Sequence, residues 1–339
     1  MKRIEKIFVA CFLFSVLTFP FRVFEAEIFG AEPKPEVVKP EVLTGFEPLS
    51  EAELQSGWLR LFDGVSLYGW LPVEGKYTVQ GGLLVSEQKE NCQIRFTSQF
   101  GNSIVTGERR PANAEGNWTS FALNLKTDKS DRSKTPDIKL DSGQFRNIKI
   151  KPQEMKSLFD GKTLNGWKVK PKDDARIEAK IENGAIRLIG GSGAIESAGR
   201  YGDFILQLEY KTDKPINSGV FFRCIPDELM NGYECQIFNN PPDDDYKKFI
   251  GTDTGGIFRR QVGRKVGAKD GEWNHLTIFA RGTKISTWVN GIQTADWTDE
   301  RKANPNPRRG CRTEAGTIQF QGHDPATDIM FRNIRIGEL

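Results

Sequence analysis

Alternating apolar and polar side chains recur in short segments along the second half of the chain. Such alternation, with many β-branched and aromatic residues, is typical of β-strands whose two faces meet different surroundings. We expect strands at residues 204–210, 219–224, 233–238, 275–279 and 285–289. Many short strands at this spacing, with no amphipathic helix of convincing length, predict an all-β sandwich or barrel.

One sequence motif occurs twice. An opening motif, Leu-Phe-Asp-Gly followed by Gly-Trp, begins at Leu61 and again at Leu158. A closing motif, Phe-Arg-Asn-Ile, follows each of them later in the chain, at Phe145 and at Phe331. A unit whose first and last segments both recur predicts terminal strands that pair with each other and leave fewer exposed edges. We therefore expect two related β-units, residues 57–152 and 155–339, of which the first is a smaller, degenerate copy.

The first 26 residues have the features of an export signal. Three basic residues precede an apolar run at residues 7–21, which is shorter than the roughly 20 residues needed to span a bilayer. Neither Ala26 nor Ala31 sits in a good cleavage pattern, so the cleavage site stays open. We expect an exported protein, periplasmic, extracellular or on the cell surface, with no transmembrane segment beyond the signal. Residues 27–56, rich in Pro, Glu and Lys, are expected to form a tether.

Charge and cysteine content narrow the range of partners. Lys plus Arg (48) nearly balances Asp plus Glu (45), and no dense basic stripe appears. A nucleic-acid binder is therefore not expected, and neutral or weakly charged ligands are favoured. Export permits disulfides, yet Cys92, Cys224, Cys235 and Cys311 are equally compatible with buried free thiols.

Strand alternation also separates the polar side chains from the apolar ones. Glu234 and Gln236, for example, alternate with Tyr233, Cys235 and Ile237. The same argument assigns to one polar face Arg223, Glu234, Gln236, Trp288, Gln319 and Gln321. Planar amides and charged groups can meet sugar hydroxyls, and an indole can stack on a pyranose ring, so this face is typical of a carbohydrate-binding surface.

The second unit resembles the 3-keto-disaccharide hydrolase domain family. The resemblance rests on segments in the expected order: Asn217-Ser218-Gly219-Val220-Phe221-Phe222-Arg223, Gly232-Tyr233-Glu234, Thr254-Gly255-Gly256, Glu272-Trp273-Asn274, Trp288 with Asn290-Gly291, and Gln319 with Gln321-Gly322-His323. It implies a concanavalin-like jelly-roll sandwich, commonly found in exported bacterial proteins. The first unit lacks counterparts of Arg223, Glu234, Gln321 and His323, so we assign it no activity. Asp324 follows His323 where family members often carry Gly, which affects the loop that bears the imidazole.

The resemblance also implies cleavage of 3-keto-glycosides or 3-keto-disaccharides. We expect a base to remove the C2 proton, the C1 substituent to leave, and water to add back. Glu234 and His323 are the expected proton-transfer pair, and Arg223 the donor to the ketone. The residues expected to bind substrate are Ser218, Gln236, Trp288, Asn290, Gln319 and Gln321. An ordinary glycosidase needs two flanking carboxylates, whereas only Glu234 lies on the predicted polar strands.

Other interpretations stay open from the sequence. Arg223 and Glu234 could form a structural ion pair, and His323 could be an ordinary loop residue. A non-catalytic carbohydrate-binding module would need Trp288, Gln236 and Gln319 but not the basicity of Glu234. An adhesion or scaffold protein would instead expose an apolar patch on the first unit.

No cofactor and no metal site are expected. The carboxylates Asp243, Asp244, Asp245 and Asp253 could ligate calcium, but their spacing matches no EF-hand, and a solvated acidic loop is the interpretation that we favour. The cysteines and histidines show no zinc-ligand spacing. The expected partner is an oligosaccharide or glycoside substrate.

Overall fold

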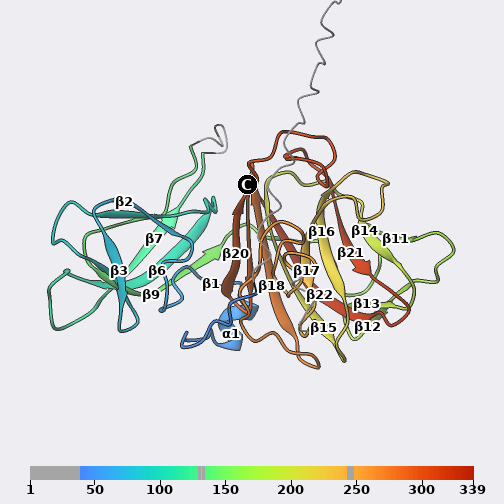
Figure 1. The fold of residues 1–339 in the computed structure, drawn as a ribbon, viewed down its shortest axis with the longest axis horizontal. Coiled ribbons are helices and arrows are strands. Elements are labelled where there is room, and N and C mark those ends of the chain that lie inside the picture. Colours follow the sequence, from blue (N-terminus) through green and yellow to red (C-terminus); the bar gives the residue numbers. More distant parts are fainter. Residues whose placement is uncertain (1–38, 129–130, 132–133, 243–247) are drawn as a thin grey trace, which may run out of the picture. The chain divides into compact units, whose positions relative to one another are not determined.

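The computed structural model describes residues 39–339 except 129–130, 132–133 and 243–247. Almost all of the regular structure in these residues is β-strand, as predicted (Figure 1). The predicted signal at 1–26 and the first part of the predicted tether lie outside the described residues. Within them, no helix has both the length and the apolar character that crossing a bilayer requires.

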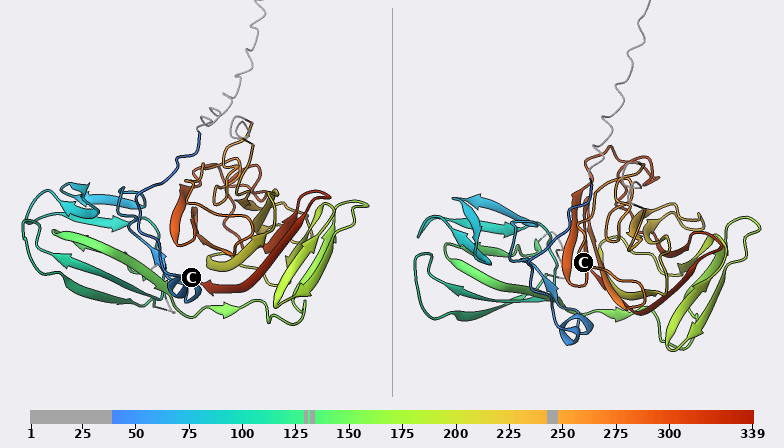
Figure 2. Two further views of the ribbon diagram at one scale, coloured as in Figure 1. Left: turned by 90° about the horizontal axis from the view of Figure 1, so that it is seen from below. Right: turned by 60° about the horizontal axis from the view of Figure 1, so that its bottom comes forward.

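The C-terminal β-domain (residues 155–339) is a jelly-roll sandwich of two sheets, seen from two further directions in Figure 2. The larger sheet follows the order β12 (Glu178–Glu182), β13 (Ala185–Ile189), β22 (Asp328–Glu338), β15 (Phe204–Thr212), β18 (Asn274–Arg281), β19 (Lys284–Val289), β20 (Ile292–Thr298), with β10 (Lys156–Ser157) beside β22. The smaller sheet follows the order β11 (Trp167–Pro171), β14 (Gly193–Ser197), β21 (Thr317–Gly322), β16 (Ser218–Cys224), β17 (Tyr233–Ile237). Alternate apolar residues of both sheets, such as Phe222, Ile278 and Phe331, form one buried core between them.

The N-terminal β-domain (residues 57–152) repeats this arrangement with fewer strands. Its larger sheet follows the order β3 (Tyr77–Gln80), β4 (Leu83–Ser86), β9 (Gln144–Pro152), β6 (Ser103–Arg110), β7 (Thr119–Leu125), with β1 (Leu59–Arg60) beside β9. Its smaller sheet follows the order β2 (Trp70–Glu74), β5 (Gln93–Phe96), β8 (Lys139–Asp141). In the described part of this domain, the order matches that of the C-terminal domain without counterparts of β16, β17, β19 and β20.

The two copies of the opening motif have the same structural role. The indole Nε1 of Trp70 donates to the carbonyl of Leu61 at 2.7 Å, and that of Trp167 donates to the carbonyl of Leu158 at 2.9 Å. The short strand before each motif pairs with the closing strand of its own domain, β1 with β9 and β10 with β22. The first residue of each motif continues this pairing, since Leu61 donates its N–H to the carbonyl of Ile148 and Leu158 to that of Ile334. The predicted pairing of terminal strands is confirmed.

The closing motif is also explained by local chemistry. In the C-terminal domain, Asn333 has φ = 50°, and Asn333 and Arg332 both donate to the buried carboxylate of Glu209. In the N-terminal domain, Asn147 has φ = 53°, and Asn147 and Arg146 donate to Glu108 in the same way. Asparagine tolerates this left-handed conformation better than most residues, which accounts for Arg-Asn at a bulge in the last strand of each domain.

The outer face of the larger C-terminal sheet is also covered. Trp288 of β19 and Phe279 of β18 point away from the domain's own core and pack with Phe96 and Phe100, at ring-centroid distances of 5.2–6.5 Å. Arg264 adds an ion pair of 2.7 Å with Asp63 of the opening motif. The sandwich surface of β18 and β19 is therefore a packing interface and not a ligand-binding face.

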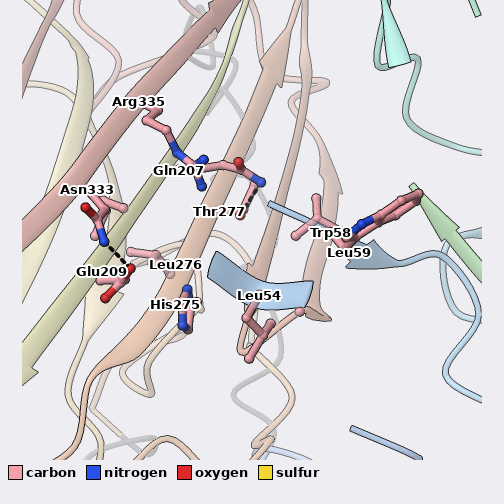
Figure 3. Close-up of a pocket in the computed structure, with 12 residues that line it drawn as sticks. Leu54, Trp58, Leu59, Gln207, Glu209, His275, Leu276, Thr277, Asn333 and Arg335 are labelled. Carbon is pink, nitrogen blue, oxygen red and sulfur yellow. Dashed lines mark hydrogen bonds between the residues drawn. The ribbon is translucent and has the colours of Figure 1, made fainter. Parts of the chain in front are cut away.

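Residues 39–56, which the sequence predicts to be tether, instead pack on the C-terminal domain. Leu43 and Leu49 are buried, and Ser50 caps the short helix α1 (Glu51–Gln55) with a capping box. The cavity beside α1, shown in Figure 3, holds only about 10 Å³, roughly one water molecule. Its polar residues bind one another, as in the hydrogen bond from Gln207 to Thr277, so it has no room for a saccharide.

The four cysteines in the described residues are free and buried. Their burial matches the interpretation of small apolar thiols, and raises the pKa of Cys224 and Cys235 above the ordinary thiol range.

Candidate functional site

The outer face of the smaller C-terminal sheet gathers polar side chains from three strands, β14, β21 and β17, and the apolar residues of β16 lie between them. Register places Glu196 opposite Gln319, Gln319 opposite Phe221, and Phe221 opposite Glu234. A second row contains Gln321 and Gln236, the latter opposite Gly219. The alternate residues of these strands, Val220, Phe222, Cys235, Ile318 and Phe320, belong to the core. Four of the six residues predicted for one polar face, Glu234, Gln236, Gln319 and Gln321, therefore share the outer face of this sheet.

Glu234 lies in the middle of β17 and is only 6% exposed. A Cβ atom on Gly219 would lie 2.8 Å from its Oε1, so the glycine leaves the space that this carboxylate occupies. Burial raises the pKa of Glu234 to about 7, although the nearby charges of Arg308 and Arg259 lower it. A carboxylate with a pKa near neutrality can accept and return a proton at physiological pH.

Arg308 supplies the cation beside this carboxylate. Its Nη2 lies 3.6 Å from Oε2 of Glu234, and its guanidinium lies over the ring of Phe221 at 5.2 Å. The loop that carries it is held by Arg301, which donates to the carbonyls of Pro307 and Gly310. Sequence reasoning missed Arg308, because nothing in its loop distinguishes it from Arg309.

Amide groups of this face are only partly engaged. Gln319 is satisfied by Met230, Glu196 and the carbonyl of Glu228. By contrast, the Oε1 atoms of Gln236 and Gln321 are buried without a hydrogen-bond partner among the described residues. Buried acceptors of this kind are costly unless a donor reaches them, and sugar hydroxyls are suitable donors.

A segment between β16 and β17 lies over this face. Met230 donates its backbone N–H to Gln319, accepts from Gln321 through its sulfur at 3.2 Å, and accepts from Arg308 through its carbonyl at 3.0 Å. Glu234 is therefore covered, whereas the side chain of Arg308 is 34% exposed. Met230 and Arg308 thus cover this polar face in the structure.

A second carboxylate lies on the same face, contrary to the prediction of only one. Glu196 Oε2 is 2.9 Å from Nζ of Lys170, and its Oε1 accepts from Thr317 and Gln319. Burial raises the pKa of Glu196, but these hydrogen bonds outweigh it and lower the pKa below the ordinary value. Three strand spacings separate Glu196 from Glu234, roughly 14 Å, beyond the separation of about 5–9.5 Å that glycosidase pairs use.

Comparison with known proteins identifies the family of the C-terminal domain. Residues 154–337, more than half of the chain, match the model of the 3-keto-alpha-glucoside-1,2-lyase-like domain. The chain belongs to this family. A curated 3-keto-disaccharide hydrolase from Bacteroides thetaiotaomicron is 26% identical over 227 residues, which cover 54% of this chain and 78% of the relative.

Two solved structures are also similar to this chain. One, from Parabacteroides distasonis ATCC 8503 and described as a candidate glycosyl hydrolase, is 28% identical with a TM-score of 0.44, covering 55% of this chain and 100% of that chain. Another, a Bacillus subtilis protein of unknown function with a galectin-like fold, is 10% identical with a TM-score of 0.41, covering 55% of this chain and 95% of that chain.

The structure corrects the expected position of Arg223 in the 3-keto-alpha-glucoside-1,2-lyase-like domain. Arg223 is fully buried, with φ = 48°, at a bulge that ends the alternation of β16. Its guanidinium donates to the carbonyls of Gly202, Gly282 and Arg312 and pairs with Asp203 at 3.0 Å. None of these contacts involves Glu234, so the alternative interpretation of a structural ion pair between Arg223 and Glu234 is wrong.

Three expected substrate-binding residues are also engaged elsewhere. Trp288 is completely buried, and its indole donates to the carbonyl of Arg60, because β19 belongs to the other sheet of the sandwich. Asn290 has φ = 48° in the turn before β20 and accepts from the backbone of His275. Ser218 is buried and donates to the carbonyl of Gln321. None of the three faces the polar surface around Glu234.

His323 follows the end of β21 and is 45% exposed. Its Nδ1 lies 2.9 Å from Oδ2 of Asp324, the residue that departs from the family pattern. Within the described residues it has no contact with Glu234, so the predicted proton-transfer pair is not assembled here.

The expected calcium ligands are only partly described. Asp243, Asp244 and Asp245 lie outside the described residues, while Asp253 is buried and 3.0 Å from Nζ of Lys265. In the described part of the chain, no three His, Cys, Asp or Glu side chains cluster as metal ligands.

Proposed function

We propose that this protein cleaves the glycosidic bond of 3-keto-glycosides by proton abstraction at C2, with Glu234 as the base. The observation that carries the proposal is a buried carboxylate with a pKa of about 7, placed beside the cation of Arg308 on a face with unpartnered amide acceptors. Family membership and the name of the Bacteroides relative support the 3-keto substrate class.

The chemistry balances without a cofactor. Glu234 takes the C2 proton, and the C–H electron pair forms the enolate of the C3 ketone. The enolate collapses to a C1–C2 double bond as the C1–O bond breaks, and the departing oxygen takes up a proton. Water then adds to C1 and a proton to C2, so that the sum of the steps is hydrolysis.

Arg308 takes the role that the sequence predicted for Arg223. Its guanidinium is next to Glu234 and a third exposed, so it can move from the carbonyl of Met230 to the developing enolate oxygen. A donor aimed at such an oxyanion contributes on the order of 10²–10³-fold to the rate. Opening of the contact between Met230 and Arg308 also admits the sugar to Gln236 and Gln321.

The test uses purified protein with 3-keto-glycosides and with their unoxidised parent sugars. We expect cleavage of the keto sugars alone, and exchange of the C2 hydrogen for deuterium in D₂O followed by NMR. Glu234→Gln should lower kcat at least about 100-fold, whereas Glu178→Gln, an exposed strand glutamate of the other sheet, should not. Equal cleavage of both sugar classes would refute the keto route, and tight binding without cleavage would indicate a carbohydrate-binding module.

The protonation of the departing oxygen is tested separately. Sequence predicts His323 as the acid, and a nitrophenolate leaving group needs no acid. If His323 has this role, His323→Gln slows cleavage of substrates with a sugar leaving group but not of those with a nitrophenol leaving group. If the variant cleaves both kinds of substrate as fast as the parent protein, water supplies the proton.

Export is proposed from the amino-terminal sequence alone. We expect the full-length chain to appear outside the cytoplasm of a bacterial host, and a variant lacking residues 1–26 to remain inside.

A further inference from the structure

The smaller sheet of the N-terminal domain ends where that of the C-terminal domain continues. In the C-terminal domain, β21 pairs with β14 on one side and β16 on the other, and β17 follows. In the N-terminal domain, β8 pairs with β5 and is the last strand of its sheet. Among the described residues of this domain, the inner face of β6 and β7 (labelled in Figure 1) therefore lacks the two strands that cover the equivalent β15 and β18.

A cleft of about 1020 Å³ lies at this place. Its apolar lining includes Phe121 and Leu123 of β7, Leu140 of β8 and Phe145 of β9. Leu123 is 37% exposed, whereas Leu140 and Phe145 are buried in the core of this domain. The cleft is thus the uncovered interior of a sandwich, a surface that is costly to leave in water.

The open edge of β8 offers backbone groups for pairing. Phe96 donates its N–H to the carbonyl of Ile138, and Arg95 stands opposite Lys139 in the same ladder. Because hydrogen-bonded and non-hydrogen-bonded pairs alternate along antiparallel strands, the N–H and carbonyl of Lys139 face away from β5, toward the open edge.

The rim of the cleft is basic. Lys89, Arg109, Arg110 and Lys139 line it, with Asp141 as the acidic residue among the lining residues. Arg109 is exposed. None of the described lining residues has a buried polar atom without a partner, so the cleft differs from the face that carries Gln236 and Gln321, where two buried amide oxygens are unpartnered.

We propose that this cleft binds an extended, acidic segment of a partner polypeptide as an added strand. The segment pairs with β8 in the place that β16 takes beside β21, which is the β-augmentation mode of peptide recognition. A strand of about five residues, roughly 17 Å long, places alternate apolar side chains on Phe121 and Leu123. Its acidic side chains lie at the rim, near Arg109 and Lys139.

The experiment measures fluorescence anisotropy of a fluorescein-labelled peptide of alternating valine and glutamate, added to the full chain. A peptide of alternating valine and lysine is the charge control. Two variants of one residue separate backbone pairing from charge: Lys139→Ala removes the ammonium group, and Lys139→Pro also removes the edge N–H. Arg109→Glu reverses the charge of an exposed rim residue, and circular dichroism checks that each variant is folded.

We expect the acidic peptide to bind and the basic peptide not to bind. Lys139→Ala should weaken binding a few-fold, and Lys139→Pro and Arg109→Glu at least about tenfold, while cleavage of keto sugars is unchanged. Equal affinity for Lys139→Ala and Lys139→Pro would overturn the proposal, as would no binding up to about 1 mM peptide. If an oligogalacturonate binds more tightly than the acidic peptide, and Lys139→Pro does not weaken that binding, the cleft would be assigned to acidic glycans. Self-association that Arg109→Glu abolishes would assign it to a second copy of this chain; either assignment overturns the proposal.

Discussion

Replacing Glu234 with glutamine should make the protein more stable as well as inactive, and the gain should depend on pH. The carboxyl group has a pKa of about 7 in the folded protein, against an ordinary value of 4.5 that the unfolded chain should show. Between these values the folded state binds more protons than the unfolded state, so the free energy of unfolding falls as the pH rises. Below about pH 4.5 this cost is absent, and above about pH 7 it is fully present.

The size of the effect follows from the two pKa values. One pKa unit corresponds to about 1.4 kcal/mol, so burial of the ionised carboxylate costs about 1 kcal/mol at pH 5 and about 3 kcal/mol at pH 8. Glutamine has nearly the same shape and carries no charge, and Arg308, at 34% exposure, keeps its hydration when the carboxylate is gone. Glu234→Gln should therefore raise the free energy of unfolding by about 2 kcal/mol more at pH 8 than at pH 5.

Urea unfolding followed by far-UV circular dichroism at both pH values measures this difference. Glu178→Gln, at an exposed strand position, is the matched control and should change stability by less than about 0.5 kcal/mol at either pH. If Glu234→Gln changes stability equally at pH 5 and pH 8, the raised pKa of Glu234 is wrong, and with it the argument that this carboxylate is prepared to accept a proton.

Three further predictions concern residues around the site. Arg308→Gln should shift the acidic limb of the pH profile of kcat/KM to a pH about one unit higher, because loss of a cation 3.6 Å away raises the pKa of Glu234 further. Arg309→Gln is the control and should leave the acidic limb at its original pH. Arg223→Met should lower the free energy of unfolding by about 3 kcal/mol, since three carbonyls and Asp203 lose their donor. It should leave the kcat of the folded fraction unchanged. A large loss of kcat in folded protein would instead indicate a catalytic role for Arg223. Trp288→Ala should cost about 3–5 kcal/mol in chemical unfolding without raising KM, whereas a stacking platform would give the reverse pattern.

Much of the fold follows from local pattern. Alternation along β15, β16, β17, β18 and β19 predicts five strands that the structure confirms. The repeated motifs predict closure of each domain, because a tryptophan that binds a carbonyl nine residues earlier needs only the local chain.

The site was predictable only where alternation holds and the sheet is known. Glu234, Gln236, Gln319 and Gln321 share a face, as alternation predicts. Arg223 does not, since a bulge with positive φ breaks the period of two. Trp288 lies on the side of its strand that alternation predicts. That strand, however, belongs to the other sheet, whose outer face is packed against other residues.

The sequence by itself determined the strands, the duplicated domain plan, the family and the polar side of the strand that carries Glu234, because each is read from patterns within short segments and from the order of those segments along the chain. Tertiary structure alone decided that Arg308, and not Arg223, lies beside Glu234, that Glu196 is paired with Lys170, and that β8 has an open edge among the described residues. These three outcomes depend on contacts between segments far apart in the chain, and on two strands that the N-terminal domain does not have. No periodicity within one segment encodes which distant loop brings its charge to a given strand.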